Sequence, residues 1–388
     1  MITKDHLQIG QSKILRLTGE FWTPGQRQAS SLHEISYRAC FKPQLPRYFI
    51  KRFTIAGDAV YDPFSGRGTT AIEAGLMGRR VVANDVNPLS RILAEPRLVP
   101  PTAKSVEERL ACIKYRKKLD ADLDLSMFYH RDTESEIVAL KKYLAQRKAS
   151  SEEDSVDLWI RMVATNRLTG HSPGFFSVYT FPPNQAVSAE SQKKINEKRK
   201  QKPEYRDTKS IILKKTKSLL SNLTDQGRAN LGKSAKSAQF LIGDARFTKG
   251  IAKESVQLTV TSPPFLDIVA YASDNWLRCW FNEIDVEAVT GTITMAKTIE
   301  QWSLVMGDIF KELYRVTKSG GWVAFEVGEI RNGKLKLEEH VVPLGMEAGF
   351  SCEAALINRQ IFTKTSNLWG VRNNEGGTNS NRIVLFRR

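Results

Sequence analysis

Two short segments of this sequence combine residue types that could bind and orient a small ligand. In the first, residues 62–70 (DPFSGRGTT), Gly66 and Gly68 lie between an apolar strand pattern and an apolar helical pattern. A glycine-rich turn at that position lets backbone amides approach a ligand at the positive end of a helix dipole. Asp85 ends the next apolar strand, where a carboxylate can accept hydrogen bonds from both hydroxyls of a ribose. No Gly-Lys-Ser/Thr of a P-loop is present, and taken alone the segment also fits an ordinary tight turn.

The second segment, residues 261–265 (TSPPF), directly follows an apolar strand. Pro263 and Pro264 have no amide hydrogen, so they fix a rigid, non-helical backbone at the carboxyl edge of the sheet, where open α/β sheets bind their ligands. Carbonyl oxygens and the Ser262 hydroxyl could accept the hydrogens of an amino group while Phe265 stacks on the ring that bears it. A lone Ser-Pro-Pro is more often a simple turn that ends a strand.

The elements that must position these segments follow an α/β pattern. Short apolar strands that alternate with helices indicate a parallel sheet. The pattern predicts strands at residues 58–61, 81–84, 240–244, 256–260, 322–327 and 383–386, and helices at 71–77 and 302–317.

The middle of the chain, residues 102–235, is rich in charge and helix formers and has few strand signals. Within it, residues 169–184 contain glycines, prolines and four aromatic residues, which predicts a loop. Residues 193–217 then carry 11 Lys or Arg against 3 acidic residues, so these 25 positions supply half of the net charge of +16.

Composition limits the class of protein. The chain has 388 residues, 41% of them hydrophobic, which is long enough for about two domains with a sizeable core. Its four cysteines form no CxxC pair and its five histidines show no ligand spacing, so we expect no disulfide framework and no metal site. We also expect no membrane segment and no signal peptide, hence a cytoplasmic protein. The excess of positive charge is consistent with a polyanionic partner.

Together the motifs resemble those of the S-adenosylmethionine-dependent amino-methyltransferases of DNA. Residues 62–70 look like the DPFxGxGTT cofactor motif of this family, and residues 243–246 (GDAR) match the strand end whose acid meets the adenine amine. Residues 41–46 (FKPQLP) resemble the segment that packs over the methionine end of the cofactor. The resemblance therefore implies S-adenosylmethionine as the cofactor, held by Lys42, Pro43, Asp62, Phe64, Gly66, Gly68, Thr69, Asp85 and Asp244.

Residues 261–265 correspond to the (D/N/S)PP(Y/F) catalytic element of the same family. Its serine form is commonest among cytosine-N4 enzymes, whereas Asp or Asn at that position is more usual for adenine-N6 enzymes. The resemblance thus implies a site-specific enzyme that methylates the N4 amine of a flipped cytosine in double-stranded DNA. The catalytic residues would be Ser262, Pro263, Pro264 and Phe265.

Three alternatives remain open at this point. They are an adenine-N6 DNA methyltransferase, an RNA guanosine amino-methyltransferase, and a DNA-binding subunit with a vestigial cofactor fold. A restriction-modification system, with a cognate nuclease as a candidate partner, would suit the DNA enzyme.

The family also implies a fold, namely a seven-stranded, mostly parallel, doubly wound class I methyltransferase sheet with an antiparallel final strand. We therefore expect a cofactor-binding part at residues 1–100, a mainly helical insert at 101–236 and a catalytic part at 237–388. The insert precedes the Asp244 strand, whereas some relatives carry theirs after the adenine-binding strand. This position leaves open whether the insert reads the DNA sequence.

The insert holds the candidate DNA-binding residues. The basic stretch would contact phosphates, although a solvated helix face explains it nearly as well. The aromatic loop, which also contains Tyr179 and Phe181, would face the bases, or else form a small core beneath the insert. The candidates are Lys198, Arg199, Lys200 and Lys202 in the stretch, and His171, Phe175 and Phe176 in the loop.

Overall fold

The structure is a computed structural model of the chain. It describes residues 2–22, 29–37, 40–115, 119–181, 186–264, 271–292, 296, 298–327, 329–330, 335–359 and 380–388.

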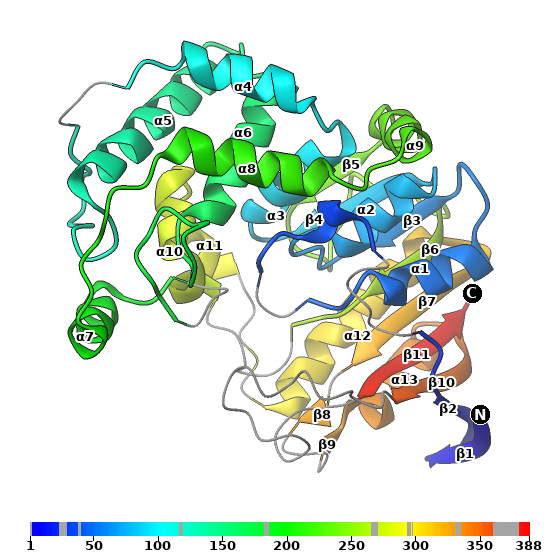
Figure 1. Cartoon of the computed structure of the whole chain (residues 1–388). Helices are drawn as coiled ribbons and strands as arrows, with labels where there is room; N and C mark the ends of the chain where they lie inside the picture. Colours follow the sequence, from blue (N-terminus) through cyan, green and yellow to red (C-terminus); the bar gives the residue numbers. More distant parts are fainter. Residues whose placement is uncertain are drawn as a thin grey trace.

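The centre of the molecule is a nine-stranded sheet with the strand order β1-β2-β10-β11-β7-β6-β3-β4-β5 (Figure 1). Five neighbouring strands, from β7 to β5, are parallel, whereas β11 is antiparallel to both of its neighbours. These relations confirm a mostly parallel, doubly wound sheet with an antiparallel final strand. In spatial order the strands are β1 (Thr3–Ile9), β2 (Ser12–Gly19), β10 (Ser351–Arg359), β11 (Ser380–Arg387), β7 (Thr317–Val327), β6 (Val256–Thr261), β3 (Ala59–Asp62), β4 (Arg80–Asp85) and β5 (Gln239–Ile242).

The sheet is two strands wider than the sequence suggested, because an N-terminal hairpin joins its edge. β1 pairs with β2, and β2 lies parallel to β10 from Arg16 opposite Ala355 to Gly19 opposite Asn358. Most side chains of β1 are exposed and Leu7 alone is fully buried in it, so the strand lacks the apolar run that marks the central strands. A further short pair, β8 (Glu329–Ile330) with β9 (Leu335–Lys336), lies outside the main sheet.

Both faces of the central strands are buried. Val60 and Val260 belong to one apolar cluster, which α1 (Gln44–Phe53) and α2 (Thr69–Leu76) cover. Tyr61 and Val323 point to the other face, which α12 (Ile299–Val316) and α13 (Leu337–Glu347) cover. Strands buried on both faces are apolar throughout, which is why the sequence reveals them.

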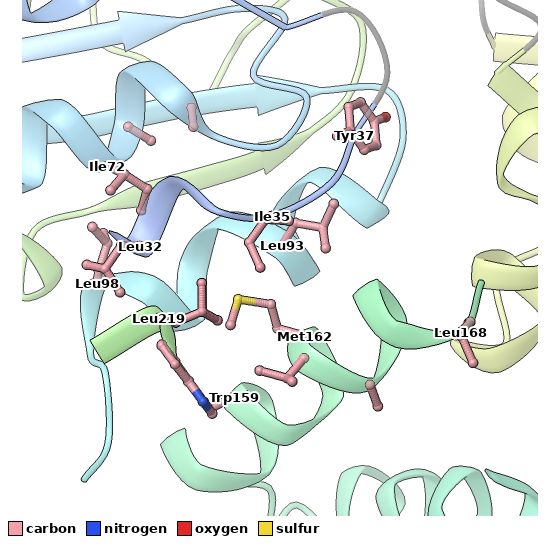
Figure 2. Packing of buried hydrophobic residues seen from close by; sticks show 14 of the residues in the cluster. Leu32, Ile35, Tyr37, Ile72, Leu93, Leu98, Trp159, Met162, Leu168 and Leu219 are labelled. Atoms are coloured by element: carbon pink, nitrogen blue, oxygen red, sulfur yellow. The ribbon is translucent and has the colours of Figure 1, made fainter. Parts of the chain in front are cut away.

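The segment between β4 and β5 is mainly helical. It packs on the side of the sheet that α1 and α2 cover. The helices of this region are α3 (Leu89–Ala94), α4 (Ala103–Cys112), α5 (Arg131–Ala149), α6 (Ser155–Arg167), α7 (Ala189–Arg199), α8 (Thr208–Leu220) and α9 (Asp225–Ala235). Figure 2 shows Trp159 and Met162 of α6 beside Leu219 of α8, with Leu93 of α3 and Leu32 of the short helical turn Ser31–His33 nearby. The last of these helices, α9, contacts α2 and β4 directly. Two more, α10 (Tyr271–Phe281) and α11 (Val286–Thr292), follow β6.

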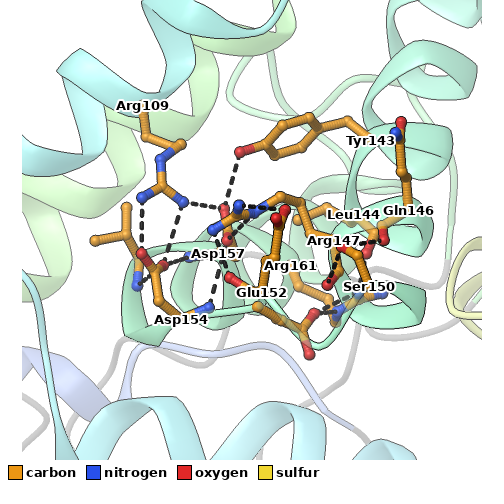
Figure 3. A network of polar contacts seen from close by, with 12 residues as sticks. Arg109, Tyr143, Leu144, Gln146, Arg147, Ser150, Glu152, Asp154, Asp157 and Arg161 are labelled. Carbon is orange, nitrogen blue, oxygen red and sulfur yellow. Dashed lines mark hydrogen bonds and ion pairs between the residues drawn. The ribbon is translucent and has the colours of Figure 1, made fainter.

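A buried ion network joins α4, α5 and α6 (Figure 3). The Asp157 carboxylate is fully buried and accepts hydrogen bonds from Arg109 at 2.5 Å and Arg147 at 2.9 Å. Asp154 caps the start of α6 and binds Arg109 at 2.7 Å. Removing one member would leave a buried charge unpaired, so the network stabilises the packing of these three helices.

Candidate active site at the carboxyl edge of the sheet

The glycine-rich turn leaves β3 after Asp62 and enters α2 at Thr69. Gly66 and Gly68 have φ angles of +50° and +78°, which only glycine adopts readily. A Cβ atom on Gly68 would lie 2.5 Å from the Cβ of Ala94, so a side chain cannot fit there without a shift. The turn therefore brings its backbone close to the edge of the sheet, as a ligand-binding turn requires.

Asp85, at the end of β4, faces this turn. Its carboxylate accepts hydrogen bonds from the Gly66 amide at 2.8 Å and the Asn87 amide at 2.9 Å. Burial raises the pKa of Asp85 to about 6, while these backbone hydrogen bonds act in the opposite direction. The structure thus brings together two of the residues that the sequence singled out.

Asp244, which follows β5, is held by a residue that sequence reasoning missed. Arg246 donates to both carboxylate oxygens, at 3.0 and 2.9 Å from its Nε atom. Burial raises the pKa of Asp244, but hydrogen bonds from Arg246 outweigh burial and lower it. Two exposed apolar side chains, Ile242 and Phe247, flank this pair along the chain. The signal available in the sequence was the arginine two positions after the acid.

Asp62 lies beneath the edge and not on it. Its carboxylate is buried and accepts hydrogen bonds from the Thr261 hydroxyl at 2.6 Å and the Phe64 amide at 3.1 Å. Burial raises its pKa to about 7. Both hydrogen bonds are accepted by Oδ1, which thereby joins the glycine-rich turn to Thr261. Contact of Asp62 with the cofactor stays a prediction.

The proline turn continues from β6 at the same edge. Pro263 is buried and Ser262 and Pro264 are partly exposed. The Pro264 carbonyl accepts a hydrogen bond from Trp302 of α12 at 3.0 Å, which fixes the turn on one side. Phe265 lies outside the described residues.

Glu326, which no sequence motif had indicated, completes this corner. It is the second-last residue of β7 and is 8% exposed. It accepts a hydrogen bond from the Asn381 amide at 2.5 Å, and it lies next to Ser262 because Phe325 pairs with Thr261. Burial raises its pKa to about 7. An acidic residue within the apolar run AFEV was the available signal.

The remaining predicted cofactor residues differ in exposure. Lys42 is exposed and Pro43 is buried at the start of α1. Thr69 is buried, and its hydroxyl accepts a hydrogen bond from Arg67 at 3.2 Å. Phe64 is half-buried between the two segments.

The aromatic loop of the helical region requires a correction. Phe175 and Phe176 are 5% and 0% exposed, so neither presents a surface to DNA. The Arg167 guanidinium lies 3.9 Å from the centre of the Phe175 ring, and a Cβ atom on Gly170 would overlap that ring. Phe176 belongs to the large apolar cluster that includes Trp159 and Met162, so the alternative of a buried role describes these two aromatics better. His171 is half-buried beside Phe175.

The basic stretch, in contrast, is exposed at Lys198, Arg199, Lys200 and Lys202. It is also tied to the loop, because the Arg199 guanidinium stacks 3.8 Å from the centre of the Tyr179 ring. Gln192 and Gln201 both donate to the Tyr179 carbonyl, at 3.0 and 2.9 Å. The two segments that the sequence treated separately therefore form one surface.

Within the described residues, no group of three or more His, Cys, Asp or Glu side chains could hold a metal ion. No helix in this part of the chain is both long and apolar enough to cross a membrane.

Comparisons with known proteins agree with the geometry. A sequence model of the family described as DNA methylase matches residues 5–92. The chain is 40% identical over 62 residues to the Type II methyltransferase M.MjaII of Methanocaldococcus jannaschii, which is 16% of this chain and 12% of that protein. It is 36% identical over 69 residues to the Type II methyltransferase M.BsoBI of Geobacillus stearothermophilus, which is 17% of this chain and 14% of that protein. The matches thus span less than a fifth of these relatives' own lengths.

Among solved structures, the rRNA methyltransferase AviRa from Streptomyces viridochromogenes aligns with 92% of this chain and 90% of its own at 12% identity. The TM-score of 0.35 is too low to support a conclusion. The sequence matches agree on the same part of the chain: residues 5–92 are similar to the family described as DNA methylase, and these relatives are Type II methyltransferases.

Proposed function

We propose that the protein transfers a methyl group from S-adenosylmethionine to an exocyclic amine of a base in double-stranded DNA, the N4 amine of cytosine being the target. The observation that carries the proposal is the junction of the two motifs. The Thr261 hydroxyl donates to Asp62 at 2.6 Å, and the Thr70 hydroxyl donates to the Val260 carbonyl at 3.0 Å. These two hydrogen bonds hold the glycine-rich turn and the proline turn side by side at one edge.

The residues present fit the proposed cofactor. The Asp85 oxygens each accept one backbone hydrogen bond and keep further acceptor capacity for ribose hydroxyls. The Ser65 hydroxyl is buried in the glycine-rich turn and has no hydrogen-bond partner within the described residues, so it can serve a ligand. Bound there, S-adenosylmethionine would supply an electrophilic methyl group on a sulfonium.

The proline turn would orient the amine that accepts the methyl group. The lone pair of an exocyclic amine is conjugated with the ring, which makes the nitrogen a poor nucleophile. Hydrogen bonds from the amine to Ser262 and the Pro263 carbonyl favour a more tetrahedral nitrogen whose lone pair points at the methyl group. Most of the rate enhancement then comes from orientation for in-line transfer.

Serine at position 262 supports cytosine as the target by resemblance to cytosine-N4 enzymes. The base must leave the duplex to reach the edge of the sheet, and Phe265 is the proposed stacking partner. The basic surface at residues 198–202 would bind the phosphates nearby. The relatives' designation as Type II methyltransferases suits a restriction-modification system with a cognate nuclease.

A nucleoside analysis tests the proposal. The purified protein is incubated with S-adenosylmethionine carrying a labelled methyl group and with unmethylated DNA of diverse sequence, and in parallel with RNA. The nucleic acid is then digested and the modified nucleoside identified by mass. We expect N4-methylcytosine from DNA, and none from the Ser262→Ala variant.

Each other outcome has a definite meaning. N6-methyladenine would keep the DNA amino-methyltransferase and overturn the cytosine assignment. A methylated guanosine from RNA alone, or no product despite cofactor binding, would overturn the function.

A further inference from the structure

Arg167, the last residue of α6, is a buried cation whose bonding partners are uncharged. It is 8% exposed. Its guanidinium donates through Nε to the Asn166 carbonyl at 3.1 Å and through Nη2 to the Asn166 side chain at 2.6 Å. Within the described residues it forms no ion pair, and its Nη1 atom has no hydrogen-bond partner but is not fully buried. The N–H groups of Nη1 are therefore available to a ligand.

Other arginines of the same helices are neutralised by acidic residues. Arg161 of α6 binds Glu153 at 2.5 Å, and Arg109 of α4 binds Asp157 at 2.5 Å. Burial lowers the pKa of Arg167 to about 10, so its guanidinium is still charged at neutral pH. Because a buried charge without a counter-ion costs free energy, Arg167 is better suited to bind an anion than to stabilise the fold.

The surroundings of this guanidinium give it one orientation. It lies 3.9 Å from the centre of the Phe175 ring. The ring packs closely on Gly170, since a Cβ atom there would come within 2.4 Å of a ring carbon. Arg206 fixes the same loop by donating to three of its carbonyl groups, those of Ser172, Phe175 and Ser177. A guanidinium that is already oriented loses little conformational entropy when it binds an anion.

Contacts connect Arg167 to the glycine-rich turn. Asn166 donates its side-chain amide to the Ser36 carbonyl at 2.9 Å. The residue after Ser36, Tyr37, is buried, and its ring lies 3.5 Å from the position of a Cβ atom on Gly66. A short segment of backbone therefore joins the neighbour of Arg167 to the turn that is proposed to hold the cofactor.

Other contacts connect Arg167 to the basic surface at residues 198–202. The loop that carries Phe175 continues to Tyr179, and the Arg199 guanidinium lies 3.8 Å from the centre of the Tyr179 ring. A duplex bound at the basic surface would present its backbone to this loop. A nucleotide extruded from that duplex towards the glycine-rich turn would then carry its phosphate past Arg167.

We propose that Arg167 binds a phosphate group of the DNA strand beside the nucleotide that is extruded for methylation. This inference rests on the proposed function. A phosphate supplies the negative charge that Arg167 lacks, and its oxygens accept hydrogen bonds from a guanidinium in a defined geometry. The exposed cations of residues 198–202 would contact the intact duplex, whereas Arg167 would meet its phosphate after extrusion. Arg167 should therefore affect the rate of methylation more than it affects binding of an intact duplex.

A cycle that combines a protein variant with a modified DNA tests this contact. The substrate is a duplex that the wild-type protein methylates, made with a neutral methylphosphonate in place of one phosphate at a time on either side of the methylated base. Single-turnover methylation is measured with the wild type and with Arg167→Gln. We expect one replacement to slow the wild type by about 10- to 100-fold, as Arg167→Gln does on the unmodified duplex. The same replacement should leave Arg167→Gln nearly unaffected, because the contact is already lost.

Two further variants complete the test. Arg228→Gln is the matched control, because Arg228 is partly buried, donates to the Pro100 carbonyl and lies in α9, at the opposite end of the helical region from α7 (Figure 1). It should respond to each methylphosphonate as the wild type does. Arg167→Lys keeps the charge without the planar guanidinium, so the sensitive replacement should slow it less than it slows the wild type, even if Arg167→Gln fails to fold.

Equal slowing of the wild type and the Arg167 variants by every methylphosphonate, or a wild type that none of them slows, would overturn the contact. Calorimetry with S-adenosylmethionine excludes another anion. If Arg167→Gln lost cofactor affinity in proportion to its rate, the guanidinium would bind the carboxylate of the cofactor, and the phosphate assignment would be wrong. The proposed function fails differently, since the wild-type protein itself would then methylate no duplex.

Discussion

Asp85 and Asp244 end neighbouring strands of the sheet, yet their carboxylates have different surroundings. Asp85 accepts hydrogen bonds from uncharged backbone amides, and burial raises its pKa to about 6. Asp244 is engaged by Arg246, which offsets the effect of burial on its pKa. A ligand's hydroxyls can therefore bind Asp85 without displacing a cation. We expect Asp85 to contribute more to cofactor binding than Asp244.

Asp85→Asn should weaken binding of S-adenosylmethionine by about 10- to 100-fold, because a charged hydrogen-bond partner contributes about 1.5–3 kcal/mol. Wild-type affinity should also decrease as the pH falls through about 6, since protonation removes acceptor capacity from Asp85. Calorimetry at pH 5 to 8 measures both effects. Asp58→Asn, placed just before β3 at the opposite end of the strand from the site, is the control. Equal affinity of Asp85→Asn and wild type would contradict the assignment.

At the scale of elements, the sequence predicts strands that are buried on both faces and misses strands that are exposed. The strands that became β3, β4, β6 and β7 are apolar because both faces of the sheet are covered, so short apolar runs revealed them. The β1-β2 hairpin lies at an exposed edge, and its polar strands carry no such run.

The same reasoning explains the site. Glycines and prolines indicated both turns, because their backbone constraints are visible in the sequence. The position of Glu326 beside Ser262 and the Thr261–Asp62 hydrogen bond depend on which strands are neighbours, and a short stretch of sequence does not reveal strand order. The Arg246–Asp244 contact is local, since the two residues are two positions apart. The sequence left open whether the aromatics of residues 169–184 face DNA or form a core, and burial of Phe175 and Phe176 favours the core.

The close packing of the glycine-rich turn leads to a prediction about the free energy of unfolding. Gly68→Ala should lower the free energy of unfolding by about 2–4 kcal/mol, because its φ of +78° and its contact with Ala94 both disfavour a Cβ atom. Gly232→Ala is the matched control, since it lies in α9 with no atom within 4 Å of the added carbon. It should stabilise the protein by about 0.5–1 kcal/mol. Urea unfolding gives both values, and a neutral Gly68→Ala would show that the turn is not close-packed.

A second prediction about stability concerns the aromatic loop at residues 169–184. Phe176→Ala should cost about 3–5 kcal/mol of stability, because the ring is completely buried. Phe181→Ala should change stability by less than about 0.5 kcal/mol, since that side chain is 45% exposed. If Phe176→Ala instead left the melting temperature unchanged and altered DNA sequence preference, the loop would be a base-reading surface after all.

On the scale of the whole molecule, the net charge of +16 is unevenly placed, and residues 193–217 supply half of it. Figure 1 shows α7 at the opposite end of the helical region from α9. The side chains of Gln192 and Gln201 and the stacked Arg199 hold this basic segment against Tyr179, so its charges have a defined position. A fixed cluster of cations that contacts phosphates contributes affinity for any duplex but no sequence preference.

Changing Lys198, Arg199, Lys200 and Lys202 together to Ala should therefore weaken binding to cognate and random duplexes alike. Each phosphate contact releases counterions from the DNA. The slope of the logarithm of the binding constant against the logarithm of the salt concentration should therefore become shallower by about 0.9 for each contact that is lost. The control changes Lys104, Lys148, Lys233 and Lys236 to Ala, exposed lysines of α4 and α5 and of the end of α9. This control also removes four positive charges, so it should alter the electrostatic field of the whole protein to a similar extent. It should nevertheless leave the slope of the salt dependence near the wild-type value. Fluorescence anisotropy across a series of salt concentrations gives the slopes, and equal slopes for the two variants would show that residues 198–202 are a solvated face.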